Sequence, residues 1–333
     1  MSVSVPKVQV YIIHSKLMDV RRQRMDALKT SLESYKGVVF TVEYVADYDP
    51  NTIKPEDISS NINLSKDNSG ELFDNLVKNM HINQISNALK HKAAIFKGAV
   101  CDADYVLVIE DDVLYGDDVV DKLKDVCGLL ATSDIELLFL GLPSLLPIDE
   151  GKTVTRKTSD FYRVLPCCDS YMASKATVLK VAQNFGLVKF TANIQLSHIC
   201  ATRNIQCHMM TPNVFLDGSK YGAYLSSVDP NSKLIFNPDF NKLASLIAKG
   251  QHTVAEDAII ENAFENIKFK NHPDVMHLEA TYLISKCNYK KAEAILDNVY
   301  AIVSQNGCII NTETEFLRTH MRMYKHMQHD VVV

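Results

Sequence analysis

The sequence lacks a long apolar stretch, an excess of basic residues and cysteines at Cys-x-x-Cys spacing. No apolar run approaches the roughly 20 residues needed to cross a bilayer, so we expect no membrane span. The net charge is −5 at pH 7. No dense group of lysines and arginines marks a nucleic-acid-binding surface, so we expect no nucleic-acid partner. The eight cysteines include no Cys-x-x-Cys pair, which excludes the ligand spacing of common zinc modules.

Two kinds of functional signal are also missing. Residues Met1–Pro6 have neither the basic nor the apolar region of a secretory signal peptide. Without an export signal, reduced cysteines and a cytoplasmic location are the simplest expectation. The sequence contains no Gly-x-x-x-x-Gly-Lys or Gly-x-Gly-x-x-Gly motif, so it has no phosphate-binding loop of either type.

The order of the predicted elements indicates two domains. With 333 residues, 47% hydrophobic and 23% charged, the chain can form one large domain and a smaller one. Strand and helix patterns alternate up to about residue 238, and only helical spacing follows. We therefore predict an α/β domain over residues 1–240 and an all-helical domain over residues 241–333. Asn288–Leu296 resembles the turn and second helix of a tetratricopeptide-type hairpin, but one helix pair is too little for a repeat array. A helical appendage, with the possibility of a protein partner, is the simpler interpretation.

The stretch Tyr105–Asp112 is the most informative. An apolar run leads directly into Glu110, Asp111 and Asp112, which predicts a strand buried on both faces. Because side chains alternate along a strand, Glu110 and Asp112 are expected on one face and Asp111 on the other. Two carboxylates about 4 Å apart repel by roughly 4 kcal/mol, and Mn²⁺ or Mg²⁺ would offset that repulsion. The alternative is a solvated acidic turn that continues through Gly116–Asp118.

The other elements are predicted from apolar spacing and from β-branched residues. Strands are expected at residues 8–13, 38–45, 136–140, 161–166, 169–174 and 205–210. Helices are expected from residue 19, over 72–100, 119–130 and 175–187, and then over 240–249, 255–267, 275–287, 289–303 and from 312. Residues 51–70 and 212–227 are expected to form loops.

Candidate ligand contacts follow these elements. His14 ends the first strand, and Arg21 opens an arginine-bearing helix that could present cations to a diphosphate, although a solvated helix face is the alternative. Asp47 follows the second strand, where an acid could accept hydrogen bonds from ribose or uracil, or could simply form a turn. His91 lies on the long helix before Tyr105, where a structural role is the alternative. Lys220 could contact a diphosphate or be solvated.

Four segments occur in the order found in a known family. They are Val10–Ser15 followed by Arg21–Met25, then Ser86–Ala94, then Val106–Val113, and finally Phe139–Gly141. Together they resemble glycosyltransferase family 25, which includes lipopolysaccharide-biosynthesis glycosyltransferases and collagen galactosyltransferases. The resemblance covers about residues 8–228 and leaves the C-terminal helices uncovered.

This resemblance implies a GT-A-like fold, in which a mixed sheet flanked by helices binds a nucleotide sugar. It also implies inverting transfer from a UDP-sugar to a glycan or glycoprotein acceptor. Glu110 and Asp112 fall where the family carries its metal and nucleotide carboxylates, and Asp111 is counted among the nucleotide contacts. The cation, Mn²⁺ or Mg²⁺, would bridge the diphosphate and assist the departure of UDP.

The sequence departs from the family at the expected general base. The family tends to carry an acid in the segment equivalent to residues 190–196, but here the residue is Asn193, which cannot act as a base. Asp169 is the first substitute and Asp217 the second. Two other functions fit the same acids. One is a catalytically silent glycosyltransferase-like protein that acts through its helical tail, and the other is a nucleotidyltransferase that holds Mg²⁺ and a nucleoside triphosphate.

Overall fold

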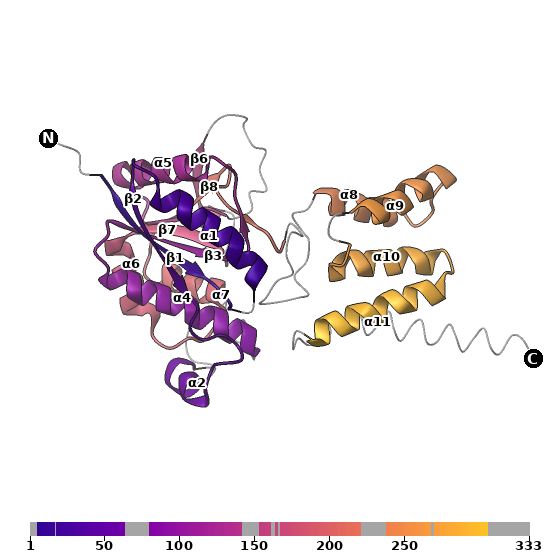
Figure 1. Ribbon diagram of the computed structural model, residues 1–333, viewed down its shortest axis with the longest axis horizontal. Coiled ribbons are helices and arrows are strands. Elements are labelled where there is room, and N and C mark those ends of the chain that lie inside the picture. Colours follow the sequence, from indigo (N-terminus) through magenta and orange to yellow (C-terminus); the bar gives the residue numbers. More distant parts are fainter. Residues whose placement is uncertain are drawn as a thin grey trace, which may run out of the picture. The chain divides into compact units, whose positions relative to one another are not determined.

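A computed structural model describes residues 5–16, 18–63, 80–141, 153–160, 164–165, 167–220, 238–267 and 270–305. The chain forms two compact units, Met1–Asp217 and Gly218–Val333 (Figure 1). The helix predicted from residue 312 and most of the strand predicted at 161–166 lie outside the described residues.

A seven-stranded mixed sheet of order β2-β1-β3-β7-β5-β8-β6 forms the centre of the first unit. β1 runs parallel to β2 and β3, whereas β7 is antiparallel to both β3 and β5. β8 is parallel to β5 and antiparallel to the edge strand β6. These strands are β1 (Lys7–Ile13), β2 (Val39–Val45), β3 (Tyr105–Glu110), β5 (Leu137–Phe139), β6 (Val154–Lys157), β7 (Ser170–Ser174) and β8 (Cys207–Thr211).

Helices cover both faces of this sheet (Figure 1). Their buried residues join two apolar layers, one with α1 and α5, the other with α4, α6 and α7. The predicted α/β architecture with a mixed, helix-flanked sheet is therefore confirmed. The helices are α1 (Asp19–Glu33), α4 (Ile82–Val100), α5 (Val119–Thr132), α6 (Lys175–Phe185) and α7 (Ala192–Thr202).

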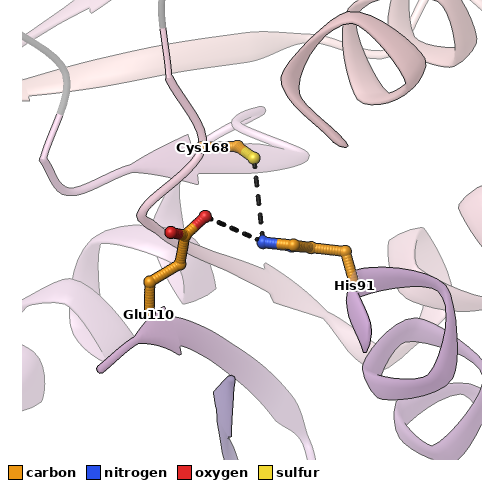
Figure 2. Close-up of side chains that lie close together, drawn as sticks. All are labelled: His91, Glu110 and Cys168. Carbon is orange, nitrogen blue, oxygen red and sulfur yellow. Dashed lines mark hydrogen bonds and ion pairs between the residues drawn. The ribbon is translucent and has the colours of Figure 1, made fainter. Parts of the chain in front are cut away.

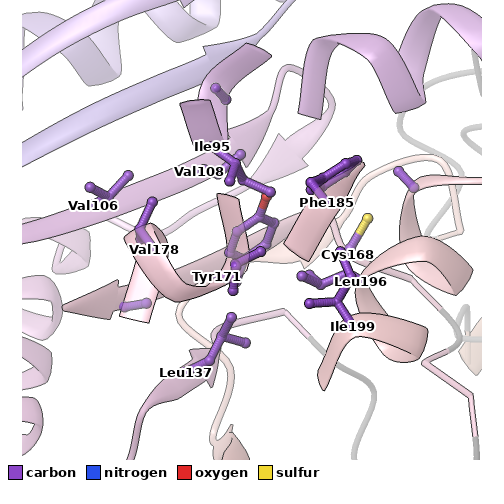
Figure 3. Close-up of a cluster of buried hydrophobic side chains, with 14 of the residues drawn as sticks. Ile95, Val106, Val108, Leu137, Cys168, Tyr171, Val178, Phe185, Leu196 and Ile199 are labelled. Carbon is purple, nitrogen blue, oxygen red and sulfur yellow. The ribbon is translucent and has the colours of Figure 1, made fainter. Parts of the chain in front are cut away.

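Strand β3 lies between the two apolar layers. Val106 and Val108 belong to the layer with α4, α6 and α7 (Figure 3), and Leu107 and Ile109 belong to the layer with α1 and α5. All four side chains are almost completely buried, and each such burial stabilises the fold by about 1.5–3 kcal/mol. The prediction of a strand buried on both faces is confirmed, so the acids at its end are attached to a strand that is packed on both sides.

The prediction of a loop over residues 51–70 is wrong in its first half, where Pro55–Asn61 forms the short helix α2. Proline suits the first helical turn because its fixed φ matches the helix and its missing N–H would be unpaired there. The Asp57 carboxylate accepts a hydrogen bond from the Lys54 amide at 3.0 Å, which fixes the start of the helix. The sequence has these start signals but no apolar stripe to reveal the helix.

Four other elements, α7, β6, β4 and β9, were not predicted. Helix α7 buries Gln195 and Ser197 together with Leu196, so polar residues interrupt the apolar stripe that would identify it. Strand β6 is polar because it lies at the edge of the sheet and pairs only with β8. A two-residue strand β9 (Leu216–Asp217) also lies within the predicted loop at 212–227, where it pairs with β4 (Val113–Leu114).

The described part of the second unit is helical, as predicted. Its main apolar cluster brings together Leu243, Ile260, Phe264, Val275 and Tyr282. Among the described residues, no helix is both long and apolar enough to cross a membrane. The helices are α8 (Pro238–Ile247), α9 (Val254–Asn266), α10 (Pro273–Ser285) and α11 (Tyr289–Gln305).

His272 gives the second unit an expected dependence on pH. Its Nδ1 accepts a hydrogen bond from the Asp274 amide at 3.2 Å and caps α10. Burial lowers the pKa of His272 to about 4, so the folded chain keeps it neutral while the unfolded chain takes up a proton near pH 6.5. We expect the free energy of unfolding to fall as the pH drops from 6.5 to 4, by up to about 1.4 kcal/mol per pH unit.

Thermal unfolding at pH 7 and pH 5 tests this expectation. The variant His272→Asn keeps a side-chain acceptor at the cap but cannot titrate. The difference in Tm between the two pH values should therefore shrink in the variant. An unchanged difference would show that His272 does not cause the pH dependence.

Candidate active site

Three consecutive acids occupy the end of β3 and the turn that follows. The strand ends at Glu110, whose side chain is 20% exposed. Asp111 and Asp112 are buried, at 5% and 6% exposure. The alternative of a solvated acidic turn therefore applies only to the exposed residues Gly116–Asp118. Buried carboxylates need partners of opposite charge or a cation, so the surroundings of each acid decide its role.

Asp111 is held by two basic side chains, those of Arg21 and His14. Arg21 Nη1 lies 2.8 Å from Asp111 Oδ1, and His14 Nδ1 lies 2.7 Å from Asp111 Oδ2. The amide of Ser15 also donates to Oδ2, at 3.2 Å. Burial alone would raise the pKa of Asp111, but the hydrogen bond from His14 and the charge of Arg21 outweigh burial and lower it. The structure thus brings together three predicted nucleotide contacts, His14, Arg21 and Asp111, as an internal ion-pair network.

Asp112 lies in a more negative environment. Its carboxylate is 4.0 Å from Arg21 Nη1, and β4 pairs Val113 with Asp217 of β9. Burial raises the pKa of Asp112 well above its usual range, and the nearby charges of Asp217 and Glu110 raise it further, against the opposing effect of Arg21. A divalent cation beside Asp112 would relieve this repulsion.

The two predicted catalytic acids, Asp169 and Asp217, come together. One carboxylate oxygen of each, with the sulfur of Cys167, lies within 4.8 Å of the others. Gly141, two residues after β5, lets Asp169 pack against the backbone, because a Cβ there would clash with Asp169 Oδ2. The backbone carbonyl of Asp169 also accepts from the Glu110 amide at 2.7 Å. Asp169 is thus fixed next to the acidic end of β3.

His91 of α4 reaches the same region from the other apolar layer. Its Nε2 lies 3.0 Å from Glu110 Oε1 and 3.8 Å from Cys168 Sγ (Figure 2). Its Nδ1 lies 3.1 Å from the hydroxyl of Tyr171, and the two rings are stacked with centroids 5.9 Å apart. Burial raises the pKa of Tyr171 well above its usual range, which keeps that hydroxyl protonated.

Asp47 does not join these buried acids. Asp47 is exposed in the turn after β2. Lys220 belongs to the second unit and ends the described segment 167–220. The buried acid of the turn after β2 is instead Asp49, which forms an ion pair with Lys90 of α4.

Sequence reasoning missed the Asp49–Lys90 pair. Lys90 also donates to the carbonyl of His14 at 2.8 Å, and Asp49 accepts from the Lys16 amide at 3.0 Å. The pair thus ties together the loops that follow β1 and β2. One signal was present in the sequence, since Lys90 stands four residues from Ser86 and from Ala94 on the buried face of α4, where an unpaired lysine would be costly.

Comparisons with known proteins add little to this geometry. No protein-family model matches the chain, and no curated protein matches it. Among solved structures, the crystal structure of S. aureus TarS 1–349 aligns over 96% of this chain and 91% of that chain, with 9% sequence identity and a TM-score of 0.33. A similarity at this level carries no argument about the fold or the activity of this chain.

Proposed function

We propose that this protein is a metal-dependent inverting glycosyltransferase that moves a sugar from a UDP-sugar to a glycan or glycoprotein acceptor. The observation that carries the proposal is the convergence of buried carboxylates, those of Asp112, Asp169 and Asp217, at the carboxyl end of the central strand β3. In open α/β sheets, ligands bind beyond the carboxyl ends of the strands. The ordered motifs that resemble glycosyltransferase family 25, on a mixed sheet of the GT-A kind, support the choice of reaction.

The carboxylates suit a hard cation. Asp112 and Glu110 are the proposed ligands for Mn²⁺ or Mg²⁺, because these ions prefer carboxylate oxygens. Arg21 is shared between two acids, since its Nη1 lies 2.8 Å from Asp111 and 4.0 Å from Asp112. When bound, the cation would supply positive charge to the diphosphate and so assist the departure of UDP.

The chain's own residues would position the donor and move the proton. Asp111, held by Arg21 and His14, would keep the turn after β3 in one conformation. A carboxylate oxygen of Asp169, or failing that of Asp217, would take the proton from the acceptor hydroxyl. Close packing of Asp169 against Gly141 would fix the direction of that oxygen, which is what a general base requires.

One observation favours a second candidate, a catalytically silent relative that acts through its helical tail. Asn193 Nδ2 donates to the carbonyl of Leu165 at 2.8 Å, and its Oδ1 accepts from the Thr191 hydroxyl at 2.8 Å. The residue that replaces the family's acid therefore has structural partners at both ends of its amide. The catalytically silent candidate would be favoured over the enzyme if Glu110→Ala and Asp112→Ala left the biological role intact.

A thermal-shift panel tests the proposed donor. UDP-, GDP- and CMP-sugars are each added with and without Mn²⁺. We expect only UDP compounds with Mn²⁺ to raise the Tm, because a ligand at roughly 100 times its dissociation constant adds about 2.7 kcal/mol of stability. A shift with nucleoside triphosphates alone would favour the nucleotidyltransferase, and no shift with any nucleotide would favour the silent relative.

A further inference from the structure

We propose that His91, Glu110 and Cys168 form a binding site for Zn²⁺. The three residues come from different elements: His91 from α4, Glu110 from the end of β3, and Cys168 from the segment before β7. Their ligand atoms all lie within 4.8 Å of one another, and Figure 2 shows the three side chains pointing toward one point. Imidazole nitrogen, thiolate sulfur and carboxylate oxygen are the three ligand types that Zn²⁺ takes from proteins.

The distances match a tetrahedral site. Zn²⁺ binds nitrogen and oxygen at about 2.0–2.2 Å and sulfur at about 2.3 Å, so tetrahedral neighbours lie roughly 3.4–3.6 Å apart. Here Nε2 is 3.0 Å from Glu110 Oε1 and 3.8 Å from Cys168 Sγ. Both distances are within a few tenths of an ångström of the tetrahedral values, and the third, from the Glu110 oxygen to the Cys168 sulfur, is at most 4.8 Å.

One ring nitrogen, Nε2 of His91, faces both the Glu110 oxygen and the Cys168 sulfur. An imidazole N–H donates one well-directed hydrogen bond, whereas a metal ion bound to Nε2 would be shared by the oxygen and the sulfur.

Tyr171 would act as the outer partner of the site. Metal binding through Nε2 leaves the proton of neutral imidazole on Nδ1, which lies 3.1 Å from the Tyr171 hydroxyl. That hydroxyl can accept this proton's hydrogen bond, or donate to Nδ1 when the metal is absent. Ligating histidines usually have such a partner for the second nitrogen.

Glu110 lies on the exposed side of the site. His91 and Cys168 are buried, whereas the Glu110 side chain is 20% exposed. Three protein ligands would leave one tetrahedral position for water or substrate. Catalytic zinc sites have this arrangement.

This inference goes beyond the proposed function, since it needs neither a nucleotide nor Asp112. The thiol distinguishes the site from the oxygen-only site proposed for Mn²⁺ or Mg²⁺, because sulfur selects softer metals. Glu110 belongs to both, and a carboxylate can use its two oxygens for two ions. Sequence spacing could not indicate the site, because its ligands lie 19 and 58 residues apart.

Zinc binding to the metal-free full-length protein tests the proposal. Zn²⁺ alone is titrated in competition with a chromophoric chelator, and Co²⁺ is used to detect thiolate-to-cobalt absorption. We expect one Zn²⁺ per chain and a cobalt–thiolate band. Cys168→Ser should lower the zinc affinity more than about 100-fold, and Tyr171→Phe about 10- to 100-fold. Cys167→Ser, which replaces the adjacent buried thiol, is the matched control. It should change neither the zinc affinity nor the cobalt–thiolate band.

Two results would overturn the proposal. One is a wild-type protein without stoichiometric zinc or without the cobalt–thiolate band, which needs no variant to interpret. The other is loss of zinc binding in Cys167→Ser but not in Cys168→Ser, which would move the ion to the group of Cys167, Asp169 and Asp217. If Cys168→Ser does not fold, His91→Gln replaces it and should lose zinc to the same extent. Failure of this site would leave Mn²⁺-dependent UDP binding unaffected, so the two proposals fail separately.

Discussion

The free energy of unfolding of the variant Arg21→Met should be about 3–5 kcal/mol lower than that of the wild type. Arg21 is 4% exposed and donates to Asp111 at 2.8 Å. Its removal would leave Asp111 with His14 and the Ser15 amide, and would deprive Asp112 of the positive charge that opposes its neighbours. Methionine fills much of the same volume, so the loss would come from charge rather than from a cavity.

Urea unfolding at pH 7 measures this difference, and the same helix offers a control. Arg22 lies one residue away and pairs with Asp26, and both side chains are largely exposed. Arg22→Met should therefore cost no more than about 1 kcal/mol. In the double variant Arg21→Met with Asp111→Asn, part of the loss should be recovered, because one buried charge is removed with its partner. Equal and small losses for Arg21→Met and Arg22→Met would show that the ion-pair network does not stabilise the fold.

Asp112→Asn should lower the Mn²⁺-dependent affinity for UDP more than about 100-fold, since loss of an outer partner of a metal ligand already costs 10- to 100-fold. Asparagine keeps the shape of the side chain and removes its charge, so the fold should be retained. Isothermal titration of UDP with Mn²⁺, and again with a chelator, measures the effect. Asp118→Asn is the control, because Asp118 is an exposed acid in the same turn region. Unchanged affinity in Asp112→Asn would remove Asp112 from the metal site.

The sequence is most informative where one pattern decides the structure. The apolar run that ends at Glu110 predicts the central strand, because only a strand covered on both faces tolerates such a run. The helices α4, α5 and α6 follow from regular apolar spacing. The acids at the strand end follow from the same run, since the chain must leave the sheet where its apolar residues stop.

The partners of these acids could not be predicted in the same way. The expected alternation of side chains ends with β3 at Glu110, so it no longer governs Asp112, which lies 4.0 Å from the same arginine that binds Asp111. Pairs such as Asp49 with Lys90 join residues 41 positions apart, and no local pattern encodes that distance. Helix α7 and strand β6 were missed because tertiary packing, rather than their own apolar spacing, gives them their structure.

Crystals of the protein with UDP and Mn²⁺, measured at the manganese absorption edge, would test the central claim most directly. We expect an anomalous manganese peak at bonding distance from a carboxylate oxygen of Asp112, with the diphosphate of UDP as a further ligand of the ion. A manganese peak elsewhere, or UDP bound away from the carboxyl end of β3, would contradict it.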